Sequence, residues 1–185
     1  ATGQELHTLA VDPSVVFGGT FVINMLGVAA DGVVYAANLT TDASASALKV
    51  YRWENDNADT LPVECFVGDP GNGSSPRWGD NMDVRGAGDQ TQILLGSRNG
   101  TSVSILNTTD GFSFVQNPLD VADAVGGNFG LGVVFGKGDT FWGKGSGTGL
   151  RQVGFDLTAI TATTLADFGT GTVPSAMTAI GLDLE

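Results

Sequence analysis

The stretch Leu48-Lys49-Val50-Tyr51-Arg52-Trp53 decides the fold, because its alternation of apolar and other residues returns twice further along the chain. It returns as Ser102-Val103-Ser104-Ile105-Leu106 and as Leu150-Arg151-Gln152-Val153-Gly154-Phe155. When Val50, Val103 and Val153 are taken as equivalent, the copies stand 53 and 50 residues apart. Alternation with a period of two predicts β-strands, and a repeat of this length is typical of β-propeller blades.

Each of these strands is the third in a group of four predicted strands. Turn residues such as Asp31-Gly32 and Asp110-Gly111 separate the strands within a group. The first group, residues 25–68, has predicted strands at 25–30, 33–37, 48–53 and 63–67. The second group, residues 81–116, has them at 81–85, 92–95, 102–106 and 112–115. The third group, residues 131–169, has them at 131–135, 140–142, 150–155 and 163–168.

The three groups predict an all-β fold of the β-propeller type within a single domain, residues 1–185. It should contain three four-stranded blades and an incomplete fourth unit that begins at residue 178. Residues 1–20 are expected to supply an outer strand. Propellers typically close with four or more blades, so three blades would leave open faces. We expect these faces to be covered by further blades of the same protein or by other copies of the chain.

The composition supports an all-β chain with a buried core. Val, Ile and Thr, which favour strands, number 43, whereas Lys, Arg, Glu and Gln together number 17. With 42% apolar and 15% charged residues, the 185-residue chain can bury a core and does not have the composition of a disordered chain.

Charge and the scarcity of two residue types argue against several functions. The net charge is −12 and the three lysines and five arginines are scattered, which argues against a nucleic acid partner and against anionic membranes. No apolar run approaches the roughly 18–20 residues of a membrane span. The single cysteine, Cys65, excludes an internal disulfide framework. The single histidine, His7, leaves almost nothing from which to build a His-based site, which argues against a zinc site and a Ser/His/Asp hydrolase. We expect Cys65 to be a buried strand residue and His7 an exposed one.

The sequence is compatible with a mature secreted protein. It begins Ala1-Thr2-Gly3-Gln4 and shows no signal peptide, as a secreted chain would after cleavage. Four Asn-X-Ser/Thr triplets are candidate glycosylation sites, although turns rich in Asn, Gly, Ser and Thr also produce such triplets by accident. They begin at Asn38, Asn72, Asn99 and Asn107. We predict a secreted or extracellular-surface location.

Several motifs carry a family resemblance. They are residues 34–41 (Val-Tyr-Ala-Ala-Asn-Leu-Thr-Thr), 49–53 (Lys-Val-Tyr-Arg-Trp), 77–86 (Arg-Trp-Gly-Asp-Asn-Met-Asp-Val-Arg-Gly), 108–111 (Thr-Thr-Asp-Gly) and 139–144 (Asp-Thr-Phe-Trp-Gly-Lys). Over roughly residues 25–185 the chain resembles an uncharacterised domain-of-unknown-function family of secreted bacterial proteins with propeller-like repeats. The resemblance implies an extracellular repeat fold, and it implies no reaction.

A candidate ligand site lies in the densest polar and aromatic cluster, which consists of Arg77, Trp78, Asp80, Asp83 and Arg85. The cluster falls between an outer strand and the next inner strand, which in a propeller is one end of the central channel. A Trp face beside Arg and Asp could stack on a sugar and hydrogen-bond to it. The alternative is that Arg–Asp pairs fix the packing between blades while Trp78 fills the gap between them.

A second candidate is a Ca²⁺ site, the one cofactor that the sequence suggests. Asp56 and Asp59 belong to Glu54-Asn55-Asp56-Asn57-Ala58-Asp59, a run of oxygen donors of the kind that hard cations prefer. The run lacks the central Gly and the terminal Glu of an EF-hand loop, so a solvated acidic turn is the alternative.

The sequence contains two features that bear on catalysis. The segment Thr108–Phe114 resembles the Asp-box turn of sialidase-type propellers, which is a structural motif, and the chain lacks the arginine cluster of a sialidase. Carboxylates for glycoside hydrolysis could come from Asp69, Asp80, Asp83 and Asp123.

These observations predict a non-catalytic extracellular structural or binding module. It would assemble through its open blade edges, for instance into a surface layer or filament, and could bind a glycan. The alternative is a fragment of a secreted polysaccharide-acting enzyme, a glycoside hydrolase or lyase, with acidic residues at the channel mouth. The fold itself does not decide between them.

Overall fold

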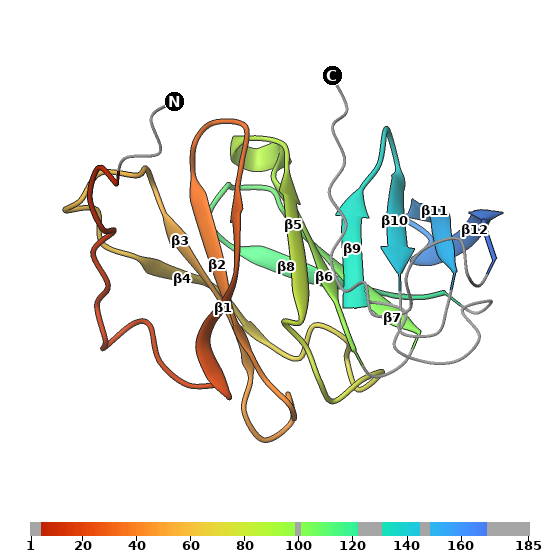
Figure 1. Cartoon of the computed structure of the whole chain (residues 1–185), viewed down its shortest axis with the longest axis horizontal. Helices are drawn as coiled ribbons and strands as arrows, with labels where there is room; N and C mark the ends of the chain where they lie inside the picture. The colour runs from red at the N-terminus through yellow and green to blue at the C-terminus, as the bar shows by residue number, and fades with distance from the viewer. Residues whose placement is uncertain (1–4, 99–100, 122–130, 145–148, 170–185) are drawn as a thin grey trace.

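The described part of the chain folds into three antiparallel sheets of four strands each (Figure 1). The structure is a computed structural model and describes residues 5–98, 101–121, 131–144 and 149–169. The first sheet contains β1 (Phe21–Val28), β2 (Val34–Leu39), β3 (Leu48–Trp53) and β4 (Val63–Gly68). The second contains β5 (Asn81–Arg85), β6 (Gln92–Gly96), β7 (Ser102–Thr108) and β8 (Phe114–Asp120), with a short 3-10 helix η1 (Gly88–Gln90) after β5. The third contains β9 (Gly132–Phe135), β10 (Thr140–Lys144), β11 (Leu150–Asp156) and β12 (Thr161–Asp167).

The twelve strands predicted from the sequence are all confirmed, with bounds that differ by a few residues. Within each sheet the strands follow one another in chain order, because each is joined to the next by an antiparallel connection. The predicted unit that begins at residue 178 lies outside the described residues.

The first strands of the three sheets, β1, β5 and β9, lie side by side (Figure 1). β1 contacts β5 and β5 contacts β9, whereas the last strands contact one another less. The three sheets therefore stack face to face, and side chains fill each of the two gaps between neighbouring sheets.

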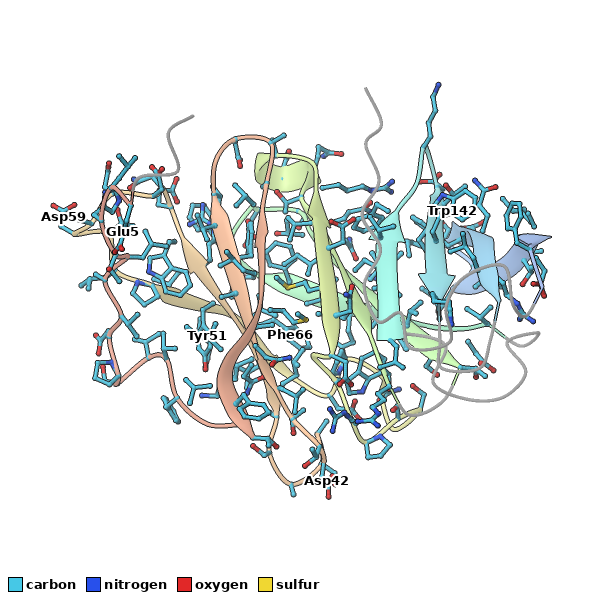
Figure 2. The ribbon with its side chains drawn as sticks, viewed as in Figure 1. Glu5, Asp42, Tyr51, Asp59, Phe66 and Trp142 are labelled. Carbon is cyan, nitrogen blue, oxygen red and sulfur yellow. The ribbon has the colours of Figure 1, made fainter. Side chains whose placement is uncertain are left out.

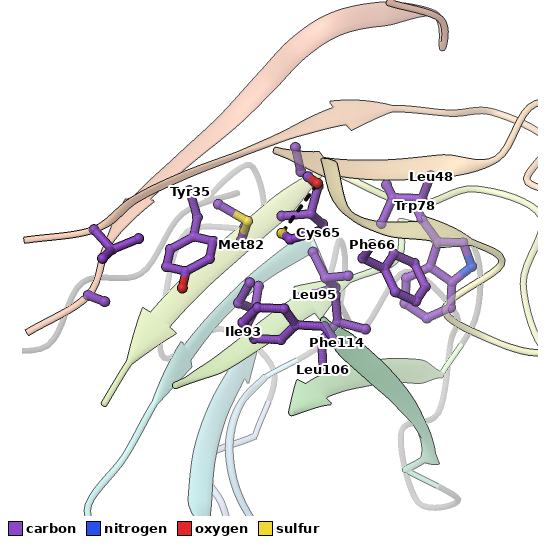
Figure 3. Close-up of a cluster of buried hydrophobic side chains, with 14 of the residues drawn as sticks. Tyr35, Leu48, Cys65, Phe66, Trp78, Met82, Ile93, Leu95, Leu106 and Phe114 are labelled. Atoms are coloured by element: carbon purple, nitrogen blue, oxygen red, sulfur yellow. Dashed lines mark hydrogen bonds between the residues drawn. The ribbon is translucent and has the colours of Figure 1, made fainter. Parts of the chain in front are cut away.

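A core of apolar side chains separates the first and second sheets (Figure 3). Tyr35 and Phe66 project from the first sheet toward Ile93 and Leu95 of the second, and the rings of Tyr35 and Phe114 meet edge-on at 5.7 Å between centroids. Cys65 lies in this core and donates its Sγ–H to the Val50 carbonyl oxygen at 3.3 Å. Burial raises the pKa of the Cys65 thiol to about 12, so it is a core residue, as predicted.

Two further apolar clusters lie on either side of this core (Figure 2). Between the second and third sheets, buried residues such as Leu94, Ile105, Phe141 and Val153 pack together. Tyr51 belongs to the third cluster, on the face of the first sheet opposite to Phe66.

The N-terminal segment corrects one sequence-based expectation. Residues 5–20 contain no strand, and His7 is exposed in a coil, where its Nε2 contacts the Asp56 carbonyl oxygen. The segment instead crosses the first sheet on its outer face. Tyr51 Oη donates to the Phe17 carbonyl oxygen at 2.9 Å and Trp53 Nε1 donates to that of Ala10 at 2.8 Å. These two hydrogen bonds, together with the packing of Leu9, Val15 and Val16 on β2 and β3, hold the segment on the face of the sheet and not at a sheet edge.

The turn between β7 and β8 is held by Asp110, as expected for an Asp-box-like turn. Its Oδ1 accepts N–H bonds from Phe112 and Ser113, both at 2.8 Å, and an O–H bond from Thr108 at 2.9 Å. These bonds to the charged form lower the pKa of Asp110 to about 2. Gly111 supplies the positive φ of 77° that closes the turn.

Gly27 sets how closely β1 can approach β5. A Cβ at this position would lie 2.5 Å from Cγ2 of Val84, a distance that real carbon atoms do not tolerate. We expect Gly27→Ala to lower the free energy of unfolding by about 1–3 kcal/mol, because the added methyl group overlaps Val84. Urea unfolding followed by tryptophan fluorescence measures this loss.

Val84→Ala removes the clashing methyl group, so the double variant should lose less stability than the sum of the two single losses. Gly154→Ala is the control, because its methyl group would meet only the flexible end of Leu165, at 3.3 Å. Strict additivity of the Gly27 and Val84 losses would contradict the proposed contact.

Candidate functional site

The connection between β4 and β5 contains the first half of the cluster singled out in the sequence. Arg77 holds Asp80 with two parallel bonds, from Nε to Oδ2 at 2.8 Å and from Nη2 to Oδ1 at 2.6 Å. Asp80 also accepts the backbone N–H of Arg98, from the turn after β6, at 3.1 Å. Asp80 raises the pKa of the Arg77 guanidinium, mainly through these bonds. The pair therefore joins two loops of the fold.

Trp78 is a packing residue in this structure. Its side chain is fully buried, and its indole Nε1 donates to the Ser75 carbonyl oxygen at 2.9 Å. Its backbone exchanges two 3.0 Å hydrogen bonds with Thr40, so it ties the connection to the end of β2. A buried ring has no face to offer to a sugar, which corrects the stacking role considered from the sequence and fits the packing alternative.

Arg85 ends β5, whereas Asp80 precedes the first residue of that strand. The rise of a strand places their Cα atoms roughly 16 Å apart. Arg85 donates from Nη1 to the Gly138 carbonyl oxygen at 2.5 Å and lies over the Phe135 ring at 4.2 Å from its centroid. The five predicted ligand-binding residues therefore do not form one site, because β5 separates Arg77 and Asp80 from Arg85.

Asp83 and Asn81 join the second sheet to the third. Asp83 Oδ2 accepts the backbone N–H of Phe135 at 2.7 Å, and Asn81 Oδ1 accepts that of Val133 at 3.2 Å. Burial raises the pKa of Asp83, although the Phe135 N–H bond opposes the shift. This carboxylate therefore serves the contact between sheets.

A polar pocket lies next to Arg85, at the end of the molecule that also carries η1 (upper end in Figure 1). Its volume is about 480 Å³, and its lining comes from η1, β6, the end of β7, the β7–β8 turn and the β9–β10 turn. The lining residues are Asp89, Gln90, Thr91, Gln92, Asn107, Thr108, Thr109 and Asp139. Sequence reasoning missed this set.

The other carboxylates considered for hydrolysis have structural partners. Asp69 accepts the backbone N–H groups of Gly71 at 2.9 Å and Gly73 at 2.7 Å, which closes the turn after β4. Asp80 and Asp83 are engaged as described above, and Asp123 lies outside the described residues.

Asp56 and Asp59 are exposed in the β3–β4 connection. Asn55 shapes this turn, because its Oδ1 accepts the Asn57 N–H at 3.0 Å and the Thr60 hydroxyl at 2.5 Å. Among the residues that the structure describes, no three His, Cys, Asp or Glu side chains are grouped as a metal site would require. Calcium binding here stays a prediction.

The four predicted glycosylation sites differ in accessibility. Asn38 is fully buried, its Oδ1 accepts the Lys49 N–H at 2.9 Å and its Nδ2 donates to Ala47 at 3.3 Å. The folded chain therefore offers no free Asn38 amide, which corrects that prediction. Asn72 is exposed, Asn107 is half-buried, and Asn99 lies outside the described residues.

The outer face of the first sheet is apolar across three strands. Leu26 pairs with Ala36 and Val28 pairs with Val34, and cross-strand partners project to the same side of a sheet. Leu9, Val15 and Val16 of the N-terminal segment pack on β2 and β3 of this face. Leu26 and Val28 of β1 stay 63% and 54% exposed, so the segment covers only part of the face.

The third sheet has an apolar group on its outer face, opposite to the core that contains Phe141 and Val153. The rings of Trp142 and Phe168 stack at 5.7 Å between centroids, and Leu165 contacts Gly154 on the neighbouring strand. Leu165 and Phe168 are 57% and 49% exposed. In the part of the chain described by the structure, no helix has the length and apolar character of a membrane span.

The pKa of Asp83 leads to a stability prediction. The pKa of Asp83 is raised in the folded chain, because burial disfavours the charged carboxylate. At pH 7 the carboxylate is charged, and its burial lowers the free energy of unfolding. This loss disappears as the pH falls through the pKa of the folded chain toward the ordinary pKa of about 3.9. Asparagine keeps an oxygen for the Phe135 N–H and carries no charge. Asp83→Asn should therefore raise the free energy of unfolding at pH 7, with a gain that shrinks toward about pH 3.5.

Chemical unfolding across this pH range measures the gain, and Asp59→Asn, a change of an exposed carboxylate, is the control. A less stable Asp83→Asn protein at pH 7 would contradict the prediction.

No family model matches the chain, and no curated protein matches it. A solved structure of a DUF4623 family protein from Bacteroides eggerthii DSM 20697 aligns with a TM-score of 0.62 and 20% sequence identity, over 89% of this chain and 36% of that one. A protein from Lactobacillus plantarum aligns with a TM-score of 0.41 and 12% identity, over 84% of this chain and 57% of that one. The chain thus spans well under half of the Bacteroides protein. This similarity shows a shared fold with a protein from a domain-of-unknown-function family, the kind of relative that the sequence resemblance implied.

Proposed function

We propose that this chain is a non-catalytic, propeller-type module that assembles head to tail. The outer face of the first sheet in one copy packs against the outer face of the third sheet in the next copy. Such a contact uses two different surfaces, so it builds rings or filaments.

The exposed apolar side chains of β1 carry this proposal. Inside the chain, a sheet face that meets another sheet is apolar, as Leu94 and Ile105 of the second sheet are toward the third. Leu26 and Val28 continue an apolar face in the same way, yet more than half of each side chain is exposed. Adjoining exposed apolar residues on a sheet face are typical of a protein–protein contact.

The engagement of the carboxylates supports a non-catalytic role over a polysaccharide-acting enzyme. A glycosidase needs two carboxyl groups that face one another across the substrate. Asp69, Asp80 and Asp83 instead accept hydrogen bonds that close a turn or join two segments. The extracellular location stays a prediction from the sequence.

The test is the mass of the protein in solution. We expect wild-type protein at about 100 µM, well within the range of weak protein contacts, to form oligomers by size-exclusion chromatography with light scattering. Each copy carries a net charge of −12, so salt that screens this repulsion should strengthen the association. Leu26→Asp should reduce the mass to that of a single chain, because it places a charge in the contact.

Val115→Asp is the matched control, because Val115 is also an exposed strand residue, 63% exposed, but belongs to β8 of the second sheet. It should associate like the wild type. A wild-type protein that stays a single chain at every salt concentration, or Leu26→Asp oligomers equal to those of the wild type, would refute the proposal.

A further inference from the structure

The polar pocket lies where the second and third sheets open at one end. Gln92 of β6 and Asn107 of β7 are direct cross-strand partners, and Arg85 of β5 is the partner of Gln92 on its other side. These three side chains form a polar row across the second sheet, beyond the apolar residues Leu94 and Ile105. Asp139 approaches the row from the third sheet, with its Oδ1 at 3.7 Å from Arg85 Nη2.

Arg85 fixes the orientation of the Gln92 amide. Its Nε and Nη2 donate to Gln92 Oε1 at 2.8 and 2.6 Å. A guanidinium has only donors, so the atom that it grips must be the amide oxygen. The NH₂ group of Gln92 is thereby left to donate elsewhere, and Gln92 is one of the residues that line the pocket.

Asn117 fixes the Asn107 amide in the same way. Its Nδ2 donates to the Asn107 Oδ1 at 2.5 Å, and it is identified as the nitrogen because it also donates to the Ile105 carbonyl oxygen at 2.9 Å. The Asn107 NH₂ group is therefore also directed away from its partner, and Asn107 lines the same pocket. Two neighbouring strands thus present two oriented amide donors.

Acceptors lie on the other parts of the lining. Asp89 and Asp139 contribute carboxylates, and Thr109 contributes a hydroxyl group that donates or accepts. An anionic ligand would face two carboxylates on a chain of net charge −12. A metal cation would face the amide N–H groups and the Arg85 guanidinium, which are not ligands. Ligand hydroxyl groups, which both donate and accept, match this mixture of donors and acceptors.

We propose that this pocket binds a neutral oligosaccharide, with the NH₂ groups of Gln92 and Asn107 donating to its hydroxyl oxygens and Asp139 accepting from a hydroxyl group. The volume of about 480 Å³ lies within the usual range of small-molecule sites. The proposal does not depend on assembly of the chain, because all the lining residues belong to one copy.

The experiment measures binding of defined hexasaccharides by isothermal titration calorimetry. The probes are neutral hexamers of β-1,4-glucose, β-1,4-xylose, β-1,4-mannose and α-1,6-glucose, with hexagalacturonate and chitosan hexamer as the charged comparisons and CaCl₂ as the cation. We expect at least one neutral hexamer to bind with a Kd below about 1 mM, and to bind more tightly than either charged hexamer.

Gln92→Glu and Asn107→Asp test the two amides with nearly isosteric changes. Each variant keeps the oxygen that its neighbour, Arg85 or Asn117, already holds, and replaces only the NH₂ group by an oxygen. Each should weaken binding about tenfold, because a donor becomes an acceptor. The thermal midpoint reports folding and should be unchanged.

Gln152→Glu is the matched control. Gln152 is likewise a half-buried strand glutamine, but it lies on β11 of the third sheet and does not line the pocket. It should bind like the wild type. The proposal is overturned if no neutral hexamer binds, if a charged hexamer or Ca²⁺ binds more tightly, or if the two pocket variants retain wild-type affinity while folded.

Discussion

The stacking of the second and third sheets depends on one constraint: the backbone N–H groups along the free edge of β9 need hydrogen-bond acceptors. A strand at the edge of a sheet leaves such groups without strand partners, and burying them unpaired is costly. Asn81 accepts the N–H group of Val133 and Asp83 accepts that of Phe135, and the two residues of each pair are 52 positions apart in the sequence. This separation lies between the two repeat spacings of 53 and 50 residues, so equivalent strands lie next to each other. The core between the second and third sheets and the polar row of Arg85, Gln92 and Asn107 both follow from this placement.

The strands were predictable from sequence because each carries its own local pattern. Leu48–Trp53 alternates, the turns contain Gly and Asp, and the spacing repeats, so each strand was found without knowledge of its neighbours. The N-terminal segment shows the limit of this reasoning. Residues 1–20 were expected to supply an outer strand, but hydrogen bonds from Tyr51 and Trp53 hold the described part of this segment, residues 5–20, as a coil across a sheet. Those partners lie more than 30 residues away, and no local pattern encodes them.

The candidate site was harder to predict, because its chemistry depends on cross-strand register. Arg77 to Arg85 is one cluster in the sequence, but an extended strand spreads it over two ends of a sheet. Gln92, Asn107 and Asp139 are far apart in sequence and meet through pairing and stacking. One signal was present in the sequence. Gln92 and Asn107 each stand two residues from a core residue, Leu94 and Ile105, so they lie on the same face of the sheet as the core. An alternating strand is expected to carry apolar side chains at such positions, and these two are polar.

The contact between Gly27 and Val84 also bears on the shape of any longer array. At Gly27 the first strands come so close that an added side chain would overlap Val84, whereas the rings of Phe66, Trp78 and Phe114 fill the space further out. The gap between the first two sheets is therefore a wedge, narrow at the first strands and wide at the last ones. Sheets added with the same wedge would turn progressively about the first strands, so the array would curve instead of extending in a straight line.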